Sequence, residues 1–198
     1  MDDNFIVHVN LADRERLLRE ILHRRLNLRF IAQMRADTIV RNPSIIKLTS
    51  EAGLRLVFVG IESGSNDVLR KMKKGISTDI SSKAVKILHR NGILTHGGFI
   101  IGAPYENRKQ IDETIRYAEN LTNKGLDSAQ FSIYTPLPGS RSFYEALVED
   151  KLATHNWELY NCLNPVLKTK LNPIWLFLKA SMANYLFYLK KWIRTKLG

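Results

Sequence analysis

The sequence predicts an α/β fold built on a parallel sheet of about four strands. Apolar residues at helical spacing alternate with short runs rich in Val, Ile, Leu and Phe, and these runs stop at glycines or polar residues. The composition, 44% hydrophobic and 25% charged over 198 residues, is that of an ordered chain with a sizeable core. Regular alternation of strands and helices requires parallel pairing with right-handed crossovers, as in barrels and doubly wound sheets.

The first part of the chain contains two helix–strand steps. Leucines and isoleucines recur at helical spacing within Asp13–Arg25, and Leu28–Gln33 is then predicted as a strand. Pro43 suits the first turn of a second helix, which Gly53 ends before the strand Leu54–Gly60.

Capping residues and glycines bound the helices that follow. These helices are expected from Ser65 or Asn66 to Gly75, from Ser77 or Thr78 to Gly92, and from Asn107 to about Gly125. The remaining strands are expected at Ile93–Ile101 and Ser128–Tyr134, before Pro136–Gly139 breaks the chain.

The alternation is expected to stop beyond Tyr144. We therefore divide the chain into a strand–helix unit at 1–150, an irregular connector at 151–171 and a C-terminal amphipathic helix at 172–198. Apolar residues form a stripe on that helix: Ile174, Leu178, Met182, Tyr185, Leu189 and Trp192. The run is too interrupted to span a bilayer. It favours a helix that docks on the rest of the chain, with an interfacial membrane helix as the alternative.

Charge and cysteine content restrict the function classes. A formal charge of +11 would attract anionic surfaces, but no basic stripe interleaved with aromatic residues or nucleic-acid motif accompanies it, so nucleic acid is not expected as a partner. Cys162 is the only cysteine, and the histidines lack zinc-type spacing, so neither a disulfide within the chain nor a metal site is expected. The first residues lack a signal-peptide pattern, which favours a cytoplasmic location.

Two loop sequences predict a ligand site at the carboxyl edge of the sheet. In Gly60-Ile-Glu-Ser-Gly-Ser65 and in Gly98–Glu106, an apolar run stops at glycines and a carboxylate. Small residues allow backbone amides to approach a bound molecule, and the acid can accept hydrogen bonds from ribose hydroxyls or an amino group. The pattern is typical of a site for a nucleotide-like ligand.

In order, these loops resemble those of radical S-adenosylmethionine (SAM) enzymes, most closely the branch that often carries an N-terminal cobalamin-binding domain. The resemblance covers Asp2 to about Tyr160. It implies an incomplete (βα)6 partial TIM barrel holding family strands three to six, followed by a C-terminal helical extension. The residues that the resemblance places at the cofactor are Asp3, Asn4, Arg35, Glu62, Ser63, Gly98, Ile100, Gly102 and Glu106.

The resemblance implies a role for each motif. Asp2-Asp-Asn-Phe5 is similar to the segment that contacts the SAM amino group, and Arg35 could pair with the SAM carboxylate. Glu62 and Ser63 resemble the ribose motif. Gly98–Glu106 resembles the GxIxGxPxE adenine motif, in which Ile100 offers an apolar wall and Gly98 and Gly102 keep it close to the ligand. Singly, each residue also has a structural explanation: a surface cation, a helix cap or a core side chain.

The major departure from the family is that the cluster-binding CxxxCxxC motif is absent from this sequence. In the family, this motif would lie before the segment that Asp2 begins. The resemblance implies SAM, a 4Fe-4S cluster that this chain does not ligate, and cobalamin in full-length relatives. We interpret the chain as the C-terminal part of such an enzyme, which would act on an unknown small or lipid-like molecule. The chain alone is expected to be inactive without a cluster-bearing N-terminal half or separate chain. The alternative is a non-catalytic binding module, and a charge-driven membrane or nucleic-acid protein ranks third.

Overall fold

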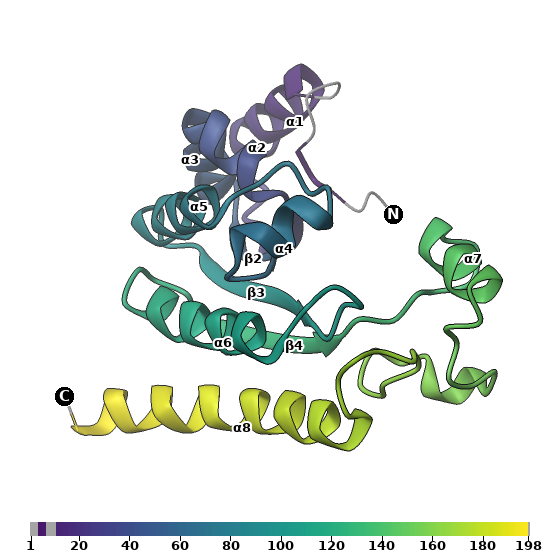
Figure 1. Cartoon of the computed structure of the whole chain (residues 1–198). Helices are drawn as coiled ribbons and strands as arrows, with labels where there is room; N and C mark the ends of the chain where they lie inside the picture. The colour runs from purple at the N-terminus through teal and green to yellow at the C-terminus, as the bar shows by residue number, and fades with distance from the viewer. Residues whose placement is uncertain (1–3, 7–10, 198) are drawn as a thin grey trace.

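The computed structural model describes residues 4–6 and 11–197. Its centre is a four-stranded parallel sheet in the order β1-β2-β3-β4 (Figure 1). The strands span Phe30–Met34 (β1), Leu54–Glu62 (β2), Leu94–Ile101 (β3) and Ser128–Ile133 (β4). All three pairings are parallel, and neighbours in the sheet follow one another in the chain. The predicted α/β class and the four parallel strands are therefore confirmed.

Helices connect these strands. Their bounds are Leu11–His23 (α1), Ala36–Arg41 (α2), Pro43–Glu51 (α3), Asn66–Lys71 (α4), Thr78–Arg90 (α5), Arg108–Thr122 (α6), Arg141–Val148 (α7) and Pro173–Leu197 (α8), with a 3-10 turn at Trp157–Leu159 (η2). Two short helices were not predicted. α2 precedes the helix that begins at Pro43, and α7 follows β4 and ends at Val148, within the unit expected at 1–150.

The caps explain where the longer helices begin. The Ser77 hydroxyl accepts a hydrogen bond from the Ile80 amide at the start of α5. The Asn107 side chain accepts from the Gln110 amide, and the Gln110 side chain accepts in return from the Asn107 amide, which forms a capping box at α6. Both starts agree with the sequence expectation.

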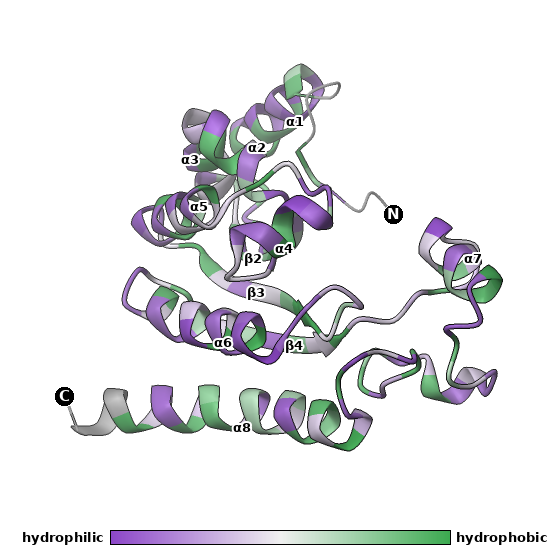
Figure 2. Ribbon diagram, viewed as in Figure 1, coloured by the Kyte–Doolittle hydropathy of each residue, from purple (hydrophilic) through white to green (hydrophobic). Residues whose placement is uncertain are grey.

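The helices cover one face of the sheet. The residues of the central strands that face these helices, such as Val57, Val59 and Phe99, are almost completely buried. Residues of the opposite face are more open, and Ile31 of β1 is 73% exposed. Figure 2 shows the hydrophobic residues of the strands among hydrophilic helix surfaces. One face of the sheet thus builds the core, and the other is left for a site.

Helix α8 completes the helical layer beside β4. It lies along α6 and β4 (Figure 1) and buries Leu176, Ala180, Ala183 and Phe187. The predicted stripe faces the other way, because Ile174, Leu178, Met182, Tyr185 and Trp192 are all exposed. The helix docks as predicted, but the stripe was the wrong face. No helix within residues 4–6 and 11–197 is long and apolar enough to cross a membrane.

Side chains of α8 also satisfy the free edge of β4. The Asn184 side-chain amide accepts from the Phe131 N–H and donates to the Phe131 carbonyl, both at 2.9 Å. The Tyr188 hydroxyl donates to the Ala129 carbonyl at 2.9 Å, and Lys191 donates to the carbonyl of Asp127. The helix therefore supplies bonds that a fifth strand would otherwise make.

Candidate functional site

The strand register places two glycines, Gly60 and Gly98, side by side on the open face of the sheet. Gly60 of β2 lies opposite Gly98 of β3, and Gly98 lies opposite Gln130 of β4. A Cβ atom on Gly98 would come within 2.7 Å of the Phe58 ring, so this glycine leaves the space that the ring occupies. Beside it, the His96 ring packs on Phe58 at 5.2 Å between centroids, and burial lowers the pKa of His96. At Gly98 the open face is thus covered by the Phe58 ring, with the His96 ring beside it.

Glu62 ends β2 in a strained conformation. Its φ of 68° is in the left-handed region, and the pairing with β3 shifts register between Gly60 and Glu62. The Ser63 amide donates to the Ile61 carbonyl at 2.9 Å across it, so Glu62 is at the centre of a γ-turn. A γ-turn with positive φ is rare and strained, and such strain persists where the surroundings enforce it.

The Glu62 carboxylate is turned back over the sheet. The residue is only 8% exposed, and its Oε1 atom pairs with the Lys74 ammonium at 2.7 Å. A Cβ atom on Gly60 would lie 2.6 Å from the same oxygen. Gly60 therefore provides the space in which this buried carboxylate rests.

Arg35 follows β1 and faces the same region. Its Nε donates to Asp37 at 3.0 Å, and one terminal nitrogen donates to the Lys74 carbonyl at 3.1 Å. A guanidinium has five N–H donors, so these bonds leave donors for a ligand. The Arg35 and Glu62 side chains are thus both tied to Lys74, one through its backbone and one through its ammonium group.

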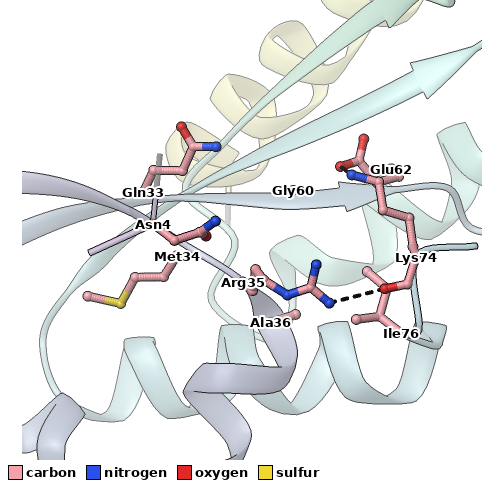
Figure 3. A pocket seen from close by; sticks show the side chains of 9 residues that line it. All are labelled: Asn4, Gln33, Met34, Arg35, Ala36, Gly60, Glu62, Lys74 and Ile76. Atoms are coloured by element: carbon pink, nitrogen blue, oxygen red, sulfur yellow. Dashed lines mark hydrogen bonds and ion pairs between the residues drawn. The ribbon is translucent and has the colours of Figure 1, made fainter. Parts of the chain in front are cut away.

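These groups line a cavity of about 110 Å³, which we call the Arg35–Glu62 cavity (Figure 3). Its walls come from the residues before β1, the ends of β1 and β2, and the loop after α4. The lining residues are Asn4, Gln33, Met34, Arg35, Ala36, Gly60, Glu62, Lys74 and Ile76. The structure therefore brings together three predicted site residues, Asn4, Arg35 and Glu62. Asp3 lies outside the described residues.

Ser63 is placed differently from its neighbour. It is fully buried, and its hydroxyl lies 3.0 Å from the Thr114 hydroxyl of α6. The Gly64 amide donates to the same Thr114 oxygen, also at 3.0 Å. Ser63 does not line the Arg35–Glu62 cavity, and its hydroxyl ties the loop after β2 to α6.

The predicted residues of β3 and its exit are divided between two faces. Gly98 and Ile100 are on the open face, as their alternation with buried Phe99 requires. Gly102 has φ +81°, and a Cβ atom there would come within 2.5 Å of Leu176. This glycine therefore allows α8 to pack close to the end of β3.

Glu106 folds into its own loop. Its Oε2 atom accepts a hydrogen bond from the Ala103 amide at 2.9 Å, and its Oε1 atom has no hydrogen-bond partner among the described residues. Burial raises the pKa of the Glu106 carboxyl to about 7, against the opposing effect of hydrogen bonds from the backbone at Ala103 and Gly102. The structure places this acid in the loop and not in the lining of the Arg35–Glu62 cavity.

Comparison with known proteins assigns the family. Residues 4–118, more than half of the chain, match the model of the radical SAM superfamily. The chain belongs to the radical SAM superfamily. A relative from Pyrococcus horikoshii, an uncharacterized methyltransferase, is 38% identical over 145 residues, which are 73% of this chain and 30% of that protein. The anaerobic magnesium-protoporphyrin IX monomethyl ester cyclase of Rubrivivax gelatinosus is 29% identical over 166 residues, 84% of this chain and 29% of the cyclase.

Solved structures share the fold. The radical SAM methyltransferase TsrM from Kitasatospora setae, determined with cobalamin and a 4Fe-4S cluster, matches with a TM-score of 0.55 and 22% identity over 67% of this chain and 25% of TsrM. The cobalamin-dependent radical SAM enzyme OxsB matches with a TM-score of 0.56 and 23% identity over 76% of this chain and 22% of OxsB. These two likenesses show a shared fold, and the radical SAM chain spans about 30% of the length of the curated relatives named above.

The donor set of this radical SAM chain does not fit an iron–sulfur cluster. Cys162 is the only cysteine in the sequence, whereas a 4Fe-4S cluster takes several thiolates. Within the described part of the chain, no three His, Cys, Asp or Glu side chains are grouped to hold a metal ion. Polar groups that suit the cofactor itself are present, because Arg35 and Glu62 offer opposite charges on one cavity.

Sequence reasoning missed several residues at this edge of the radical SAM sheet. Lys74 lines the Arg35–Glu62 cavity and also a larger one of about 460 Å³, which we call the tyrosine–lysine cavity. Among the predicted site residues that the structure describes, Ile100 alone lines this second cavity. The lining residues are Lys71, Met72, Lys73, Lys74, Ile100, Tyr105, Tyr134, Arg141, Ser142 and Glu145. The run of lysines at 71–74 was the available signal, but cations are also common at helix ends.

Proposed function

We propose that this chain binds SAM in the Arg35–Glu62 cavity, as the cofactor-binding part of a radical SAM enzyme. The observation that carries the proposal is the strained γ-turn at Glu62, which holds a buried carboxylate at the carboxyl end of β2. Strained backbone residues cluster at functional sites, and this one presents a charged group to a cavity. Ligands of open α/β sheets bind at this edge.

Different residues of the chain contact different parts of SAM in this proposal. The Arg35 guanidinium pairs with the SAM carboxylate, for which its planar donors are suited. Glu62 exchanges part of its contact with Lys74 for hydrogen bonds from the ribose hydroxyls. Ile100 lies on the same face of the sheet and lines the neighbouring cavity, so it offers an apolar surface to the adenine at the boundary between the two cavities. Both charged groups are already oriented by Lys74, so few side chains must reorder on binding.

We further propose that the reaction is a radical modification or a methyl transfer. The Pyrococcus horikoshii methyltransferase and the Rubrivivax gelatinosus cyclase support this class of chemistry. When bound, SAM would supply radical chemistry to the reaction, provided that another group delivers an electron to it. Because this chain carries one cysteine, the electron source is a cluster on an N-terminal half or a separate chain. The chain by itself is then inactive, and its substrate is a small molecule or a lipid-like molecule.

Calorimetric titration of SAM into the purified chain tests the cofactor proposal. We expect binding that the Glu62→Gln substitution weakens by roughly 1–3 kcal/mol, the value of a charged hydrogen bond. The matched control is Glu149→Gln, which also removes a carboxylate paired with a lysine, Lys151, but on the surface. Equal affinity of the two variants, or absence of binding, would contradict the proposal.

A second candidate is contact with a membrane surface through α8. The supporting observation is the exposed stripe of Ile174, Leu178, Met182, Tyr185 and Trp192 on a chain of charge +11. Helices with aromatic and apolar residues on one side bind at the boundary of headgroups and acyl chains, aided by anionic lipid. This role is compatible with cofactor binding, because the two regions use different faces. The alternative function, a non-catalytic binding module, would keep the Arg35–Glu62 cavity for ligand binding and would catalyse no reaction.

A further inference from the structure

The tyrosine–lysine cavity lies beside the Arg35–Glu62 cavity at the carboxyl edge of the sheet. The two share Lys74, and the second cavity extends across Ile100 to the first residues of α7. Its volume of about 460 Å³ is within the range of small-molecule sites. A molecule bound there would lie directly beside one bound at Glu62.

The walls suit a flat apolar body. Ile100 and Met72 provide aliphatic surface, and Tyr105 and Tyr134 provide two aromatic rings. Burial raises the pKa of Tyr105 to about 12, with a further contribution from nearby Tyr134, so its phenol stays protonated. Within the described residues, neither phenol has a hydrogen-bond partner. The cavity therefore offers two free hydroxyl groups on aromatic walls.

The charges suit an anion. Among the described residues, four cations line the cavity, Lys71, Lys73, Lys74 and Arg141, against one carboxylate. Arg141 pairs with that carboxylate, Glu145, at 2.6 Å, and Lys74 pairs with Glu62. The Lys71 ammonium lies over the Tyr105 ring, 5.7 Å from its centroid. In the described part of the chain, Lys71 and Lys73 have no carboxylate partner.

The backbone at Lys73 supports a role for its side chain. This residue follows Met72, the C-cap of α4, in the left-handed region with φ 54°, and its amide donates to the Arg70 carbonyl at 3.0 Å. Glycine is favoured at this position after a helix, and a residue with a side chain is strained there. Attraction of cations to the helix dipole explains Arg70 and Lys71, but it does not explain a lysine in this conformation.

We propose that the tyrosine–lysine cavity binds the substrate of the reaction, and that this substrate is an anionic small molecule with an apolar or aromatic body. Lys71 and Lys73 recognise its carboxylate, sulfonate or phosphate group, and Tyr105 and Tyr134 pack against its body. The inference deepens the proposed function, because it takes the neighbouring cavity as the SAM site.

The test is calorimetric titration of 2-naphthoate and of neutral 2-naphthamide into the chain. We expect the anion to bind more tightly than the amide, and the double variant Lys71→Gln/Lys73→Gln to weaken naphthoate binding about tenfold. The control is Lys83→Gln/Lys86→Gln on α5, which lowers the net charge by the same two units away from the cavity.

Three results would overturn the proposal: equal binding of the anion and the amide, equal weakening in both double variants, or no naphthoate binding at millimolar concentrations. The third result excludes the apolar, anion-bearing class that the probe represents. Titration of SAM into the unsubstituted chain separates the two proposals. Naphthoate binding without SAM binding refutes the cofactor assignment alone, and SAM binding without naphthoate binding refutes the substrate site alone.

Discussion

At the scale of single residues, Glu106 shows how burial converts a charge into a pH response. The carboxyl is 5% exposed and has a pKa of about 7 in the folded chain, against an ordinary value of 4.5. Below pH 4.5 it is neutral in both the folded and the unfolded chain. Between pH 4.5 and 7 the unfolded chain loses the proton and the folded chain retains it, so the free energy of unfolding falls as the pH rises.

We expect Glu106→Gln to flatten this dependence. Relative to the unsubstituted chain, the variant should gain roughly 1–3 kcal/mol between pH 5 and pH 8, because an amide does not ionise. Urea unfolding at the two pH values measures the difference. Glu149→Gln, which changes an exposed carboxylate, should keep the original slope. An unaltered slope in Glu106→Gln would mean that Glu106 ionises as readily in the folded chain as in the unfolded one.

Other residues show what motifs predict and what they leave out. The motif placed Glu62 at the end of β2, where the structure has it, but its spacing could not show that Ser63 turns to Thr114. The direction of each side chain depends on the γ-turn, and a γ-turn with positive φ at a glutamate has no sequence signature. Lys74 was missed for a related reason, because its partner Glu62 is 12 residues earlier in the chain and only the fold brings them together.

At the scale of elements, Asn184 closes the edge of β4 from a helix. Its amide bonds both backbone groups of Phe131 and also donates to the Ala180 carbonyl at 3.0 Å. A leucine has a similar volume but no polar atoms, so it would leave the Phe131 N–H and C=O groups without these partners. Backbone groups left without partners in a partly buried site are costly.

We expect Asn184→Leu to lower the free energy of unfolding by roughly 1–3 kcal/mol and to speed hydrogen exchange at the Phe131 amide. Asn120→Leu, at an exposed position of α6, is the control and should change neither quantity. Denaturant unfolding and exchange measured by nuclear magnetic resonance give the two readouts. Unchanged exchange at Phe131 would contradict the prediction, because it would show that the bond from Asn184 does not protect this amide.

The same helix shows the limit of sequence patterns. Periodicity selected the stripe that begins with Ile174, but the docking face contains Ala180 and Ala183. Small residues allow a helix to approach a sheet closely, yet they contribute little to a hydrophobic pattern. Both faces of α8 are apolar, so composition alone could not decide which one packs on β4. The strands were easier to predict because buried parallel strands are nearly continuous apolar runs.

At the scale of the whole molecule, the two edge strands of the sheet, β1 and β4, differ in the groups that bond their free backbone atoms. Bonds from α8 occupy the edge of β4, whereas the described contact at the edge of β1 is the Phe5 amide on the Gln33 carbonyl at 2.8 Å. The open face beside β1 includes exposed Ile31. A partner that completes the sheet would add at β1, and α8 would remain on the outside with its stripe free. The membrane proposal therefore holds with or without such a partner.

Co-sedimentation with vesicles tests the outer stripe. We expect the chain to bind vesicles that contain phosphatidylglycerol and the triple variant Leu178→Ser/Met182→Ser/Tyr185→Ser to lose that binding, since insertion of apolar side chains accounts for much of the affinity. These residues are exposed, so the substitutions should leave the fold intact, unlike deletion of α8, which would remove Leu176 and Phe187 from the core. The control is Leu147→Ser/Val148→Ser/Leu163→Ser, three exposed apolar residues away from α8. Equal binding by both triple variants would attribute the attraction to net charge, and binding should then fall steeply with added salt.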